Sequence, residues 1–385
     1  MGVLMFFTLL FIALSCSNPV AASQTFGHYD SSRPFNYVVV IVLENEGLAN
    51  IINSSLAPYM TQLASTYGLA VNYTAIAHPS LPNYLALLSG QDFISWSTND
   101  CNPSPGCFAG NATNLVDSLE NHGLTWKAYM EDYPTSCGSQ CSTGGCFMGD
   151  KGTGEYAARH DPFVYFSDIV NSTSRCSNIV PANSGGQGGP DNLFLSDLAS
   201  PSTASNLMWL TPNLCDDMHD ACTGPTNQTD NGECGTASQC VPQGDSYLEH
   251  LVPEILASNL FTHQKAALFI TFDEGNGYCP LNGSSADCVP AIWAGPTVKM
   301  SFKSTTSFSH YSFLSTLESV WHLSPLTSND AGAVAMTAFF VAHHNHHEHH
   351  DHDRYRDRDD HNDHFESTDH QHGWKNQDSY FDNDQ

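Results

Sequence analysis

The sequence predicts an α/β fold in which a mostly parallel central sheet is covered by helices on both faces. Short, continuous apolar runs alternate along the chain with segments of amphipathic, helix-like spacing. Runs that are continuously or almost continuously apolar, such as Tyr37–Leu43 and Ala266–Phe272, are typical of strands buried on both sides in a parallel sheet. Because strands alternate with helices, a parallel α/β architecture is the expected arrangement.

Glycine and proline mark the limits of two expected helices. Gly123 is expected to stop the helix Asn114–His122, and Pro253 is expected to kink the helix Ser246–Ala257 or mark its start. The loops 133–155 and 176–205 are long and rich in Gly, Ser and Cys, which is typical of functional or disulfide-held loops. Strands are expected at Tyr37–Leu43, Gly68–Tyr73, Leu124–Met130, Asn206–Leu210, Ala266–Phe272 and Val289–Trp293. Helices are expected at Ala57–Ser65, Leu81–Leu88, Asn114–His122, Ser246–Ala257 and Tyr311–Trp321.

Composition limits the classes of function. The chain has 385 residues, and 41% are hydrophobic, so it can build a substantial core. Its formal net charge is -28, with only 12 Lys and Arg residues, which excludes the basic surface of a nucleic-acid-binding protein. The same balance argues against docking on an anionic membrane. If the substrate is anionic, metal ions or histidines must supply the positive charge.

The two ends of the chain differ from the middle. Residues 1–23 have an apolar core followed by small residues, as in a signal peptide, and the apolar run is short for a membrane span. Lipid attachment at Cys16 is an alternative. Residues 342–385 are rich in His and Asp and almost lack aliphatic side chains, so we expect a disordered tail. This tail either sequesters metal ions or is simply solvated. Residues 24–341 are then expected to form the functional domain.

Cysteines and glycosylation motifs agree with secretion. Removal of Cys16 with the signal peptide leaves twelve of the 13 cysteines, and these fall into local clusters. Local disulfides that staple loops are expected, because the spacing of the clusters does not match a zinc site. Six Asn-x-Ser/Thr motifs fit a glycosylated extracellular protein. The cysteine clusters are 101/107, 137/141/146/176, 215/222/234/240 and 279/288, and the motifs begin at Asn53, Asn72, Asn111, Asn171, Asn227 and Asn282.

Polar residues follow three of the expected strands. The first strand ends in Glu44 and Asn45, and the Ala266–Phe272 strand ends in Asp273 and Glu274. The strand at 206–210 runs into a segment that contains Asn213, Asp217, His219 and Asp220. If the strands are parallel, these groups converge at one edge of the sheet. Grouped carboxylates repel one another unless a cation lies among them, so we expect a divalent metal ion with oxygen ligands. Capping of the following turns is the alternative for each carboxylate alone.

A second feature is Ser80, which precedes an apolar helix in "HPSLPNYLALLSG". A serine followed two residues later by proline is an ordinary helix N-cap. Alternatively, the Ser80 hydroxyl lies at a helix N-terminus that favours an anion. A metal ion at Glu44 would lower the pKa of this hydroxyl and make it a nucleophile, and His78 would face the same site.

Seven motifs in one order resemble a known family. The match spans roughly residues 36–323 and is similar to a secreted phosphoesterase family that includes acid phosphatases and phosphatidylinositol-3-phosphatase-like enzymes, within the alkaline phosphatase superfamily. Non-haemolytic phospholipases C are more distant members. The motifs are "FNYVVVIVLENEGLANII", "AHPSLPNYLALLSG", "YMEDYP", "YAARHDPFVYFSDI", "PNLCDDMHD", "ITFDEG" and "SFSHYSFLSTLESVWHL".

The resemblance implies a role for each matching residue. Ser80 is implied as the nucleophile, and His219 and His310 as residues that handle the phosphate or the leaving group. His160 matches another family position of less defined role. Superfamily members with two zinc ions have an Asp-His pair where this chain has Asp273 and Glu274, so one divalent metal ion of unknown identity is expected. The expected ligands are Glu44, Ser80, Asp273 and Glu274, with Asp217 as a further candidate, and the expected substrate-binding residues are Asn45, Asn83 and Asn213.

These observations predict a secreted, metal-dependent phosphomonoester hydrolase that works through a phosphoserine. The expected substrate is a phosphorylated small molecule or a phospholipid headgroup, and imidazolium groups are expected to give an acidic pH optimum. A phosphodiesterase or phospholipase C is one alternative. A non-catalytic, metal-binding secreted glycoprotein is another. Neither oligomeric state nor physiological substrate follows from the sequence.

Overall fold

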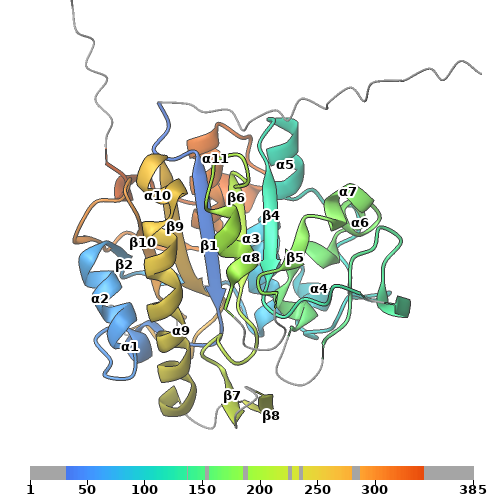
Figure 1. Ribbon diagram of the computed structural model, residues 1–385, viewed down its shortest axis with the longest axis horizontal. Coiled ribbons are helices and arrows are strands. Elements are labelled where there is room, and N and C mark those ends of the chain that lie inside the picture. The colour runs from blue at the N-terminus through green and yellow to red at the C-terminus, as the bar shows by residue number, and fades with distance from the viewer. Residues whose placement is uncertain are drawn as a thin grey trace, which may run out of the picture. The chain divides into compact units, whose positions relative to one another are not determined.

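The computed structural model describes residues 32–136, 138–151, 156–184, 190–223, 228–233, 237–279 and 287–341 (Figure 1). The predicted signal peptide and the predicted His- and Asp-rich tail lie outside these described residues. An eight-stranded sheet runs through the molecule in the order β11-β2-β10-β9-β1-β6-β4-β5. Its strands are β1 Tyr37–Leu43, β2 Gly68–Ala70, β4 Trp126–Met130, β5 Ile179–Pro181, β6 Leu207–Thr211, β9 Ala266–Phe272, β10 Ala291–Ala294 and β11 Phe302–Ser304.

The sheet is mostly parallel, as predicted. Strand β1 lies at its centre and pairs in parallel with β9 on one side and β6 on the other. Strand β10 is antiparallel to both of its neighbours. All seven residues of β1 and all seven of β9 are buried, which explains why these strands are almost entirely apolar, with Thr271 as the exception. Two short pairs lie outside the sheet: β3 Tyr73–Thr74 with β12 Phe308–Ser309, and β7 Asp220–Thr223 with β8 Gln228–Glu233.

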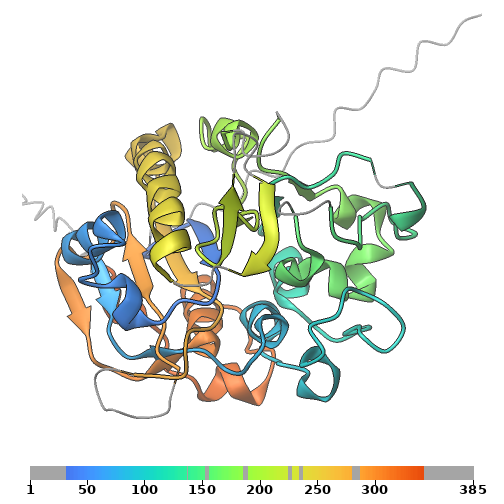
Figure 2. The same ribbon diagram turned by 90° about the horizontal axis from the view of Figure 1, so that it is seen from below.

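Helices cover both faces of the sheet. Figure 2 shows α9 on one face and α3 and α11 on the other. The helices are α1 Leu48–Ile51, α2 Pro58–Thr66, α3 Ser80–Ser89, α4 Ile94–Ser97, α5 Leu115–Asn121, α6 Ser167–Val170, α7 Thr173–Cys176, α8 Asn192–Asp197, α9 Ala237–Ala257, α10 Asn259–His263, α11 His310–Trp321 and α12 Ser328–Gly332. The 3-10 turns are η1 Gly138–Gln140, η2 Ala158–His160, η3 Pro162–Tyr165 and η4 Thr337–Phe339.

Most of the expected elements are confirmed, and three differ. The expected strand Gly68–Tyr73 is split into β2 and β3, because Tyr73 pairs with Phe308 outside the main sheet. Strand β5 and helix α8 lie in the segment 176–205 that was expected to be a loop. Helix α9 begins at Ala237, nine residues before the expected start, and contains both Pro242 and Pro253.

The early part of α9 was missed because its composition is typical of a loop. A Cβ atom on Gly244 would lie 2.3 Å from Met218 Cγ and 2.9 Å from the carbonyl oxygen of Asp216. Glycine is needed at 244 so that the helix can approach the 216–218 segment closely. Tertiary packing therefore overrides the low helix propensity of this stretch.

Loops are joined by disulfides as predicted. Cys101–Cys107, Cys146–Cys176 and Cys279–Cys288 are bonded, and each pair falls within one of the expected local clusters.

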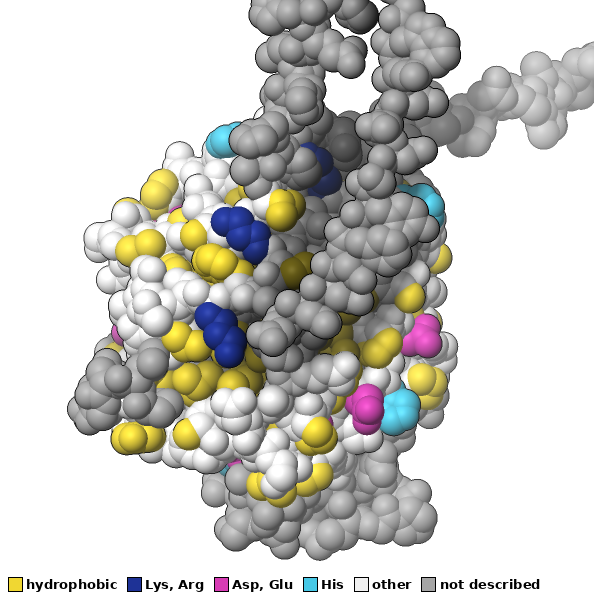
Figure 3. All heavy atoms as spheres, turned by 90° about the vertical axis from the view of Figure 1, so that its left-hand side faces the viewer, with side chains coloured by type: hydrophobic (Ala, Val, Ile, Leu, Met, Phe, Trp, Pro, Cys, Tyr) yellow, Lys and Arg dark blue, Asp and Glu magenta, His cyan; other side chains and the backbone are white. Residues whose placement is uncertain are grey.

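Lys and Arg side chains on the face shown in Figure 3 lie apart from one another and form no continuous basic stripe there. None of the described helices is long and apolar enough to span a membrane.

Candidate active site

The ends of β1 and β9 bring the first acidic residues together. Leu43 pairs with Phe272, so the residues that follow, Glu44 and Asp273, leave the sheet side by side. The backbone N–H of Asp273 donates to the Leu43 carbonyl at 2.9 Å, and the backbone N–H of Asn45 donates to Asp273 Oδ1 at 3.0 Å. The parallel register therefore places these carboxylates at one edge, as expected from the sequence.

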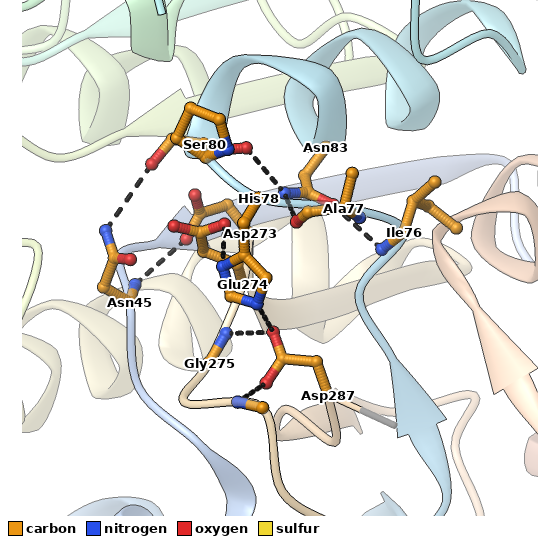
Figure 4. Close-up of polar contacts among 12 residues, drawn as sticks. Asn45, Ile76, Ala77, His78, Ser80, Asn83, Asp273, Glu274, Gly275 and Asp287 are labelled. Carbon is orange, nitrogen blue, oxygen red and sulfur yellow. Dashed lines mark hydrogen bonds and ion pairs between the residues drawn. The ribbon is translucent and has the colours of Figure 1, made fainter. Parts of the chain in front are cut away.

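Asn45 turns the chain back toward the site. It has a positive φ of 54°, a left-handed conformation that asparagine tolerates better than most residues. Its side-chain Nδ2 donates to Glu44 Oε2 at 2.7 Å. The same nitrogen lies 3.5 Å from Ser80 Oγ (Figure 4). The same atom is 3.4 Å from His219 Nδ1. Asn45 thus joins the Glu44 carboxylate, the Ser80 hydroxyl and the His219 ring.

Ser80 is the first residue of α3, and it does not cap the helix. The N-cap is Pro79, and the Ser80 hydroxyl instead donates to Glu44 Oε2 at 3.0 Å. Ser80 is 5% exposed. The free N–H groups expected at this helix end are partly occupied, because Leu81 N–H donates to Asp100 Oδ1 at 3.1 Å. The capping alternative for Ser80 is therefore wrong, and the helix N-terminus already holds an anion.

Two further groups hold the other oxygen of Glu44. The hydroxyl of Tyr84 donates to Glu44 Oε1 at 2.7 Å, and His160 Nε2 lies 3.2 Å from the same atom. The Tyr84 and His160 rings stack with their centroids 5.4 Å apart. Tyr84 was not predicted as a site residue. Its position four residues after Ser80 on one helix face is a signal that could have found it.

Burial and mutual repulsion dominate the electrostatics of the carboxylates. Burial raises the pKa of Glu44 well above its usual range, and the charges of Asp273 and Asp217 raise it further. Burial also raises the pKa of Asp273 to about 7. The pKa of Glu274 is raised to about 9 by burial and then by the charges of Asp273 and Asp287. These groups either take up protons or require a cation.

His310 lies in the site region but is not placed to act as the general acid that was predicted. Its Nε2 contacts the Asp273 carbonyl oxygen, and its Nδ1 lies 3.1 Å from the Tyr73 hydroxyl. Burial lowers the pKa of His310 to about 4, and burial also lowers the pKa of His160 well below its usual value. Burial therefore disfavours the charged form of both rings. Both rings contact groups that hold the carboxylates, and their burial opposes the imidazolium charge expected from the sequence.

His78 approaches the site from its exposed side. Its ring is 52% exposed and bridges two carboxylates, with Nδ1 2.6 Å from Glu274 Oε2 and Nε2 3.2 Å from Asp287 Oδ2. Asp287 was not predicted as a site residue. It accepts from the backbone N–H groups of Gly275 and Gly277, each at 2.7 Å (Figure 4). Asp287 therefore shapes the loop that carries Glu274.

Asn83 is a correction to the predicted set. Its Oδ1 accepts from the N–H groups of Ile76 and Ala77, and its Nδ2 donates to the carbonyls of Ala77 and Pro79 (Figure 4). Asn83 is 0% exposed. All of these bonds hold the segment that leads to Ser80, so Asn83 supports the loop and does not face the substrate.

Asn213 is the second correction. Its Nδ2 donates to Asp132 Oδ2 at 2.8 Å, and its backbone N–H donates to Glu131 Oε2 at 2.9 Å. These groups follow β4 and belong to a second buried acidic cluster with Asp191 and Asp216, beside a cavity of about 620 Å³. The parallel strands bring this cluster to the same edge of the sheet, but Asn213 bonds to it and not to Ser80.

Asp217 and His219 lie beside Glu44 and Asn45, which contact Ser80. The Glu44 N–H donates to the Asp217 carbonyl at 2.9 Å, and the charge of Asp217 acts on the Glu44 carboxylate. The His219 N–H donates to Asp217 Oδ1 at 2.8 Å. The structure thus brings together Glu44, Asn45, Ser80, His160, Asp217, His219, Asp273, Glu274 and His78, with His310 directly behind Asp273.

The donor atoms suit a hard divalent cation. Carboxylates and a hydroxyl are the ligands that such a cation prefers, and Asp273 Oδ2 is buried with no hydrogen-bond partner. Within the described ranges, no three His, Cys, Asp or Glu side chains are arranged as a ready-made metal centre. Glu44 Oε2 is instead engaged by Ser80 and Asn45. A cation would therefore have to exchange these hydrogen bonds for coordination.

The family follows from comparison with known sequences. The sequence model of the Phosphoesterase family matches residues 49–324, about 72% of the chain. The chain belongs to the phosphoesterase family. Ser80, His219 and Asp273 lie inside the matched segment, whereas Glu44 and Asn45 precede it. The resemblance inferred from the seven motifs is thereby confirmed at the level of the family.

Curated relatives of this phosphoesterase are phosphatases. A phosphatidylinositol-3-phosphatase of Mycobacterium tuberculosis is 29% identical over 303 residues, which is 79% of this chain and 82% of the relative. A phosphate-repressible acid phosphatase of Penicillium chrysogenum is 28% identical over 302 residues, 78% of this chain and 62% of the relative. An acid phosphatase of Aspergillus niger is 25% identical, and 61% of its length is matched.

Solved structures match this chain at low identity. A protein in the alkaline phosphatase superfamily from Vibrio parahaemolyticus is 13% identical, with a TM-score of 0.49 over 76% of this chain and 67% of that one. A murine ectonucleotide pyrophosphatase/phosphodiesterase is 9% identical, with a TM-score of 0.47 over 76% of this chain and 96% of that one.

Proposed function

We propose that this protein is a phosphomonoester hydrolase of the acid-phosphatase type, with Ser80 as its nucleophile. The hydrogen bond from the Ser80 hydroxyl to Glu44 Oε2 carries the proposal. A serine at the start of a buried helix, directed away from the cap position and onto a carboxylate, is the arrangement of an activated nucleophile. Membership of the phosphoesterase family supports phosphoric esters as the substrates.

The reaction has two steps. In the first, a bond forms between Ser80 Oγ and phosphorus while the bond from phosphorus to the leaving alcohol breaks. Glu44 Oε2 takes the hydroxyl proton of Ser80 and returns it in the second step, and His219, beside Asn45, donates a proton to the leaving oxygen. In the second step, water attacks the phosphoserine, His219 accepts a proton from this water, and Ser80 regains its own proton. Alcohol and phosphate are released.

Asn45 and the carboxylates prepare this chemistry. The Asn45 amide lies within hydrogen-bond reach of the Ser80 oxygen, so it can also donate to a phosphoryl oxygen bound there. Tyr84 and His160 hold the Glu44 carboxylate in place. A divalent metal ion held by Glu44, Ser80, Asp273 and Glu274, with Asp217 nearby, would lower the pKa of the hydroxyl and neutralise phosphate charge.

Hydrolysis of p-nitrophenyl phosphate tests the reaction, and the bis ester separates the two enzyme alternatives. The proposal expects the monoester to be hydrolysed at least about ten times faster than bis(p-nitrophenyl) phosphate. The reason is that the proposed site binds a terminal phosphoryl group, and the bis ester carries a second p-nitrophenyl group in its place. Acid quenching during turnover should leave phosphate covalently attached to the peptide that contains Ser80. Faster cleavage of the bis ester would favour the phosphodiesterase or phospholipase C alternative, and no hydrolysis of either ester would favour a non-catalytic glycoprotein.

We also propose that the protein is secreted and glycosylated. The disulfides support an oxidising compartment. Among the six motifs, Asn53, Asn111 and Asn171 are exposed, so a glycan can be attached there without unfolding. When the protein is expressed in eukaryotic secretory cells, it should be recovered from the culture medium with an N-terminus near residue 24. Its mass should decrease on enzymatic deglycosylation. Retention in the cytosol would contradict secretion.

A further inference from the structure

The start of helix α3 carries an ion pair that the proposed mechanism does not use. Asp100 Oδ1 accepts from Leu81 N–H at 3.1 Å, directly after Ser80. Asp100 Oδ2 in turn lies 3.3 Å from Arg159 Nε. The Asp100 carboxylate therefore lies between a helix N-terminus and a guanidinium, which are two groups that bind phosphate in proteins.

Arg159 is also tied to the other side of the site. It precedes His160, whose Nε2 lies 3.2 Å from Glu44 Oε1. The positive charge of Arg159 lowers the pKa of Glu44 and that of His160, which means that the guanidinium acts on the carboxylate that holds Ser80. Arg159 is 29% exposed and Asp100 is 27% exposed, so a substrate can reach both side chains.

Charge makes this pair significant. A phosphoester brings negative charge to a corner that already contains several carboxylates, and the charge of Asp100 acts on Asp273 and Glu274 as well. A cation is therefore needed near Ser80 to offset this negative charge. A planar guanidinium is suited to this task because it binds carboxylate and phosphate oxygens in the same forked manner.

We infer that Arg159 binds the phosphoryl group of the substrate at Ser80, and that Asp100 competes with this group for Arg159 and for Leu81 N–H. The inference rests on the proposed function. In the free enzyme, Asp100 occupies the place of an anion at the helix N-terminus. When substrate binds, its phosphoryl oxygens replace the Asp100 carboxylate as acceptors from the guanidinium. Asp100 thereby weakens the binding of phosphate and limits inhibition by the product.

The test is competitive inhibition by inorganic phosphate during hydrolysis of p-nitrophenyl phosphate by the full-length enzyme. Arg159→Ala should raise the inhibition constant by about 10- to 100-fold, and Arg159→Lys should restore part of the loss. Asp100→Asn keeps an oxygen that accepts from Leu81 N–H and removes the charge. It should lower the inhibition constant about 3- to 10-fold.

Opposite signs in the two variants are the decisive result. If the pair served only to hold two loops together, breaking it from either side would change phosphate binding in the same direction. The inference would be overturned if the inhibition constant for phosphate changed in the same direction in both variants, or if it were unchanged in Arg159→Ala. Arg175→Ala is the matched control, because Arg175 pairs with Asp117, Glu120 and Asp168 away from Ser80, and its inhibition constant should equal that of the wild type.

A second readout separates this inference from the proposed function. Inorganic phosphate should raise the melting temperature of the wild type and of Asp100→Asn, and it should have little effect on Arg159→Ala. A wild type that hydrolyses the monoester but shows no such difference between variants contradicts the role of Arg159 alone. A wild type that neither hydrolyses the monoester nor responds to phosphate contradicts the proposed function and the inference together.

Discussion

The Ser80 hydroxyl donates a 3.0 Å hydrogen bond to Glu44 Oε2, across 36 residues of sequence. This bond joins the first residue of helix α3 to the residue that follows strand β1. The two residues belong to different parts of the fold. The bond therefore exists only because β1 and α3 meet at the same edge of the sheet.

Removal of the nucleophile should abolish turnover. Ser80→Ala deletes the oxygen that bonds to phosphorus, so kcat for p-nitrophenyl phosphate should fall at least about 10³-fold. Circular dichroism and the melting temperature should remain close to those of the wild type. Ser89→Ala is the control on the same helix, because Ser89 Oγ bonds to the backbone of Leu85 and Gln91 and not to the carboxylates of the site. Half of the wild-type activity in Ser80→Ala would exclude Ser80 as the nucleophile.

Loss of the Glu44 charge should affect metal affinity and activity together. Glu44→Gln keeps the shape of the side chain and removes one anionic ligand of the proposed cation, so more metal should be needed for half-maximal activity after chelation. Glu46→Gln is the control, since Glu46 is also buried but accepts from Asn50. Unchanged metal dependence and activity in Glu44→Gln would show that Glu44 only caps the turn that follows β1.

Tyr84 should position Glu44 without taking part in chemistry. Tyr84→Phe removes only the 2.7 Å hydrogen bond to Glu44 Oε1, and kcat should fall about tenfold with little change in KM. The control Tyr129→Phe removes a buried hydroxyl that donates to Asp197. It should lower the melting temperature and leave kcat unchanged. Equal kcat in Tyr84→Phe and the wild type would show that the hydrogen bond is not needed for catalysis.

Stability should rise as the pH is lowered from about 8 to about 5. Burial raises the pKa of Glu318 from its usual value of 4.5 to about 8, and Asp330 adds to this effect. Between these two values the native state binds more protons than the unfolded state, so the free energy of unfolding decreases as pH increases. Asp161, whose pKa burial raises to about 7, acts in the same direction.

Urea denaturation of metal-free protein across this pH range measures the effect. Glu318→Gln cannot titrate and should show a smaller dependence of stability on pH than the wild type. Glu249→Gln, at an exposed position on α9, is the control and should retain the wild-type dependence. A steeper dependence in Glu318→Gln would contradict the assigned direction.

Much of the fold could be predicted because its central strands are almost entirely apolar. Strands β1 and β9 were predicted to the residue, since both are buried on both faces and each ends abruptly in a charged residue. The start of helix α9 could not be predicted in this way. Pro242 and Gly244 indicate a loop, and the reason for Gly244 is its contact with the 216–218 segment, which is distant in sequence.

The candidate site shows the same division. Glu44, Ser80 and Asp273 stand out in the sequence because polar groups interrupt or follow apolar segments, and the parallel register then brings them together. Asn83 and Asn213 were assigned to the substrate because they lie in the same motifs. Their amide groups are instead used by backbone and by a second acidic cluster. A motif places a residue near a site but does not specify the direction of its side chain.

Amino-acid order alone was enough to indicate the sheet, the acidic edge and the serine, because hydrophobic period and strand ends are local properties. Three-dimensional packing decided which imidazole rings are buried and which residues hold the carboxylates. Burial between Tyr73 and the Asp273 backbone lowers the pKa of His310 to about 4. Arg159 meets Asp100 at the start of α3 only because distant loops pack there. Burial and long-range contacts set the protonation and direction of a side chain, and neither is encoded in local spacing.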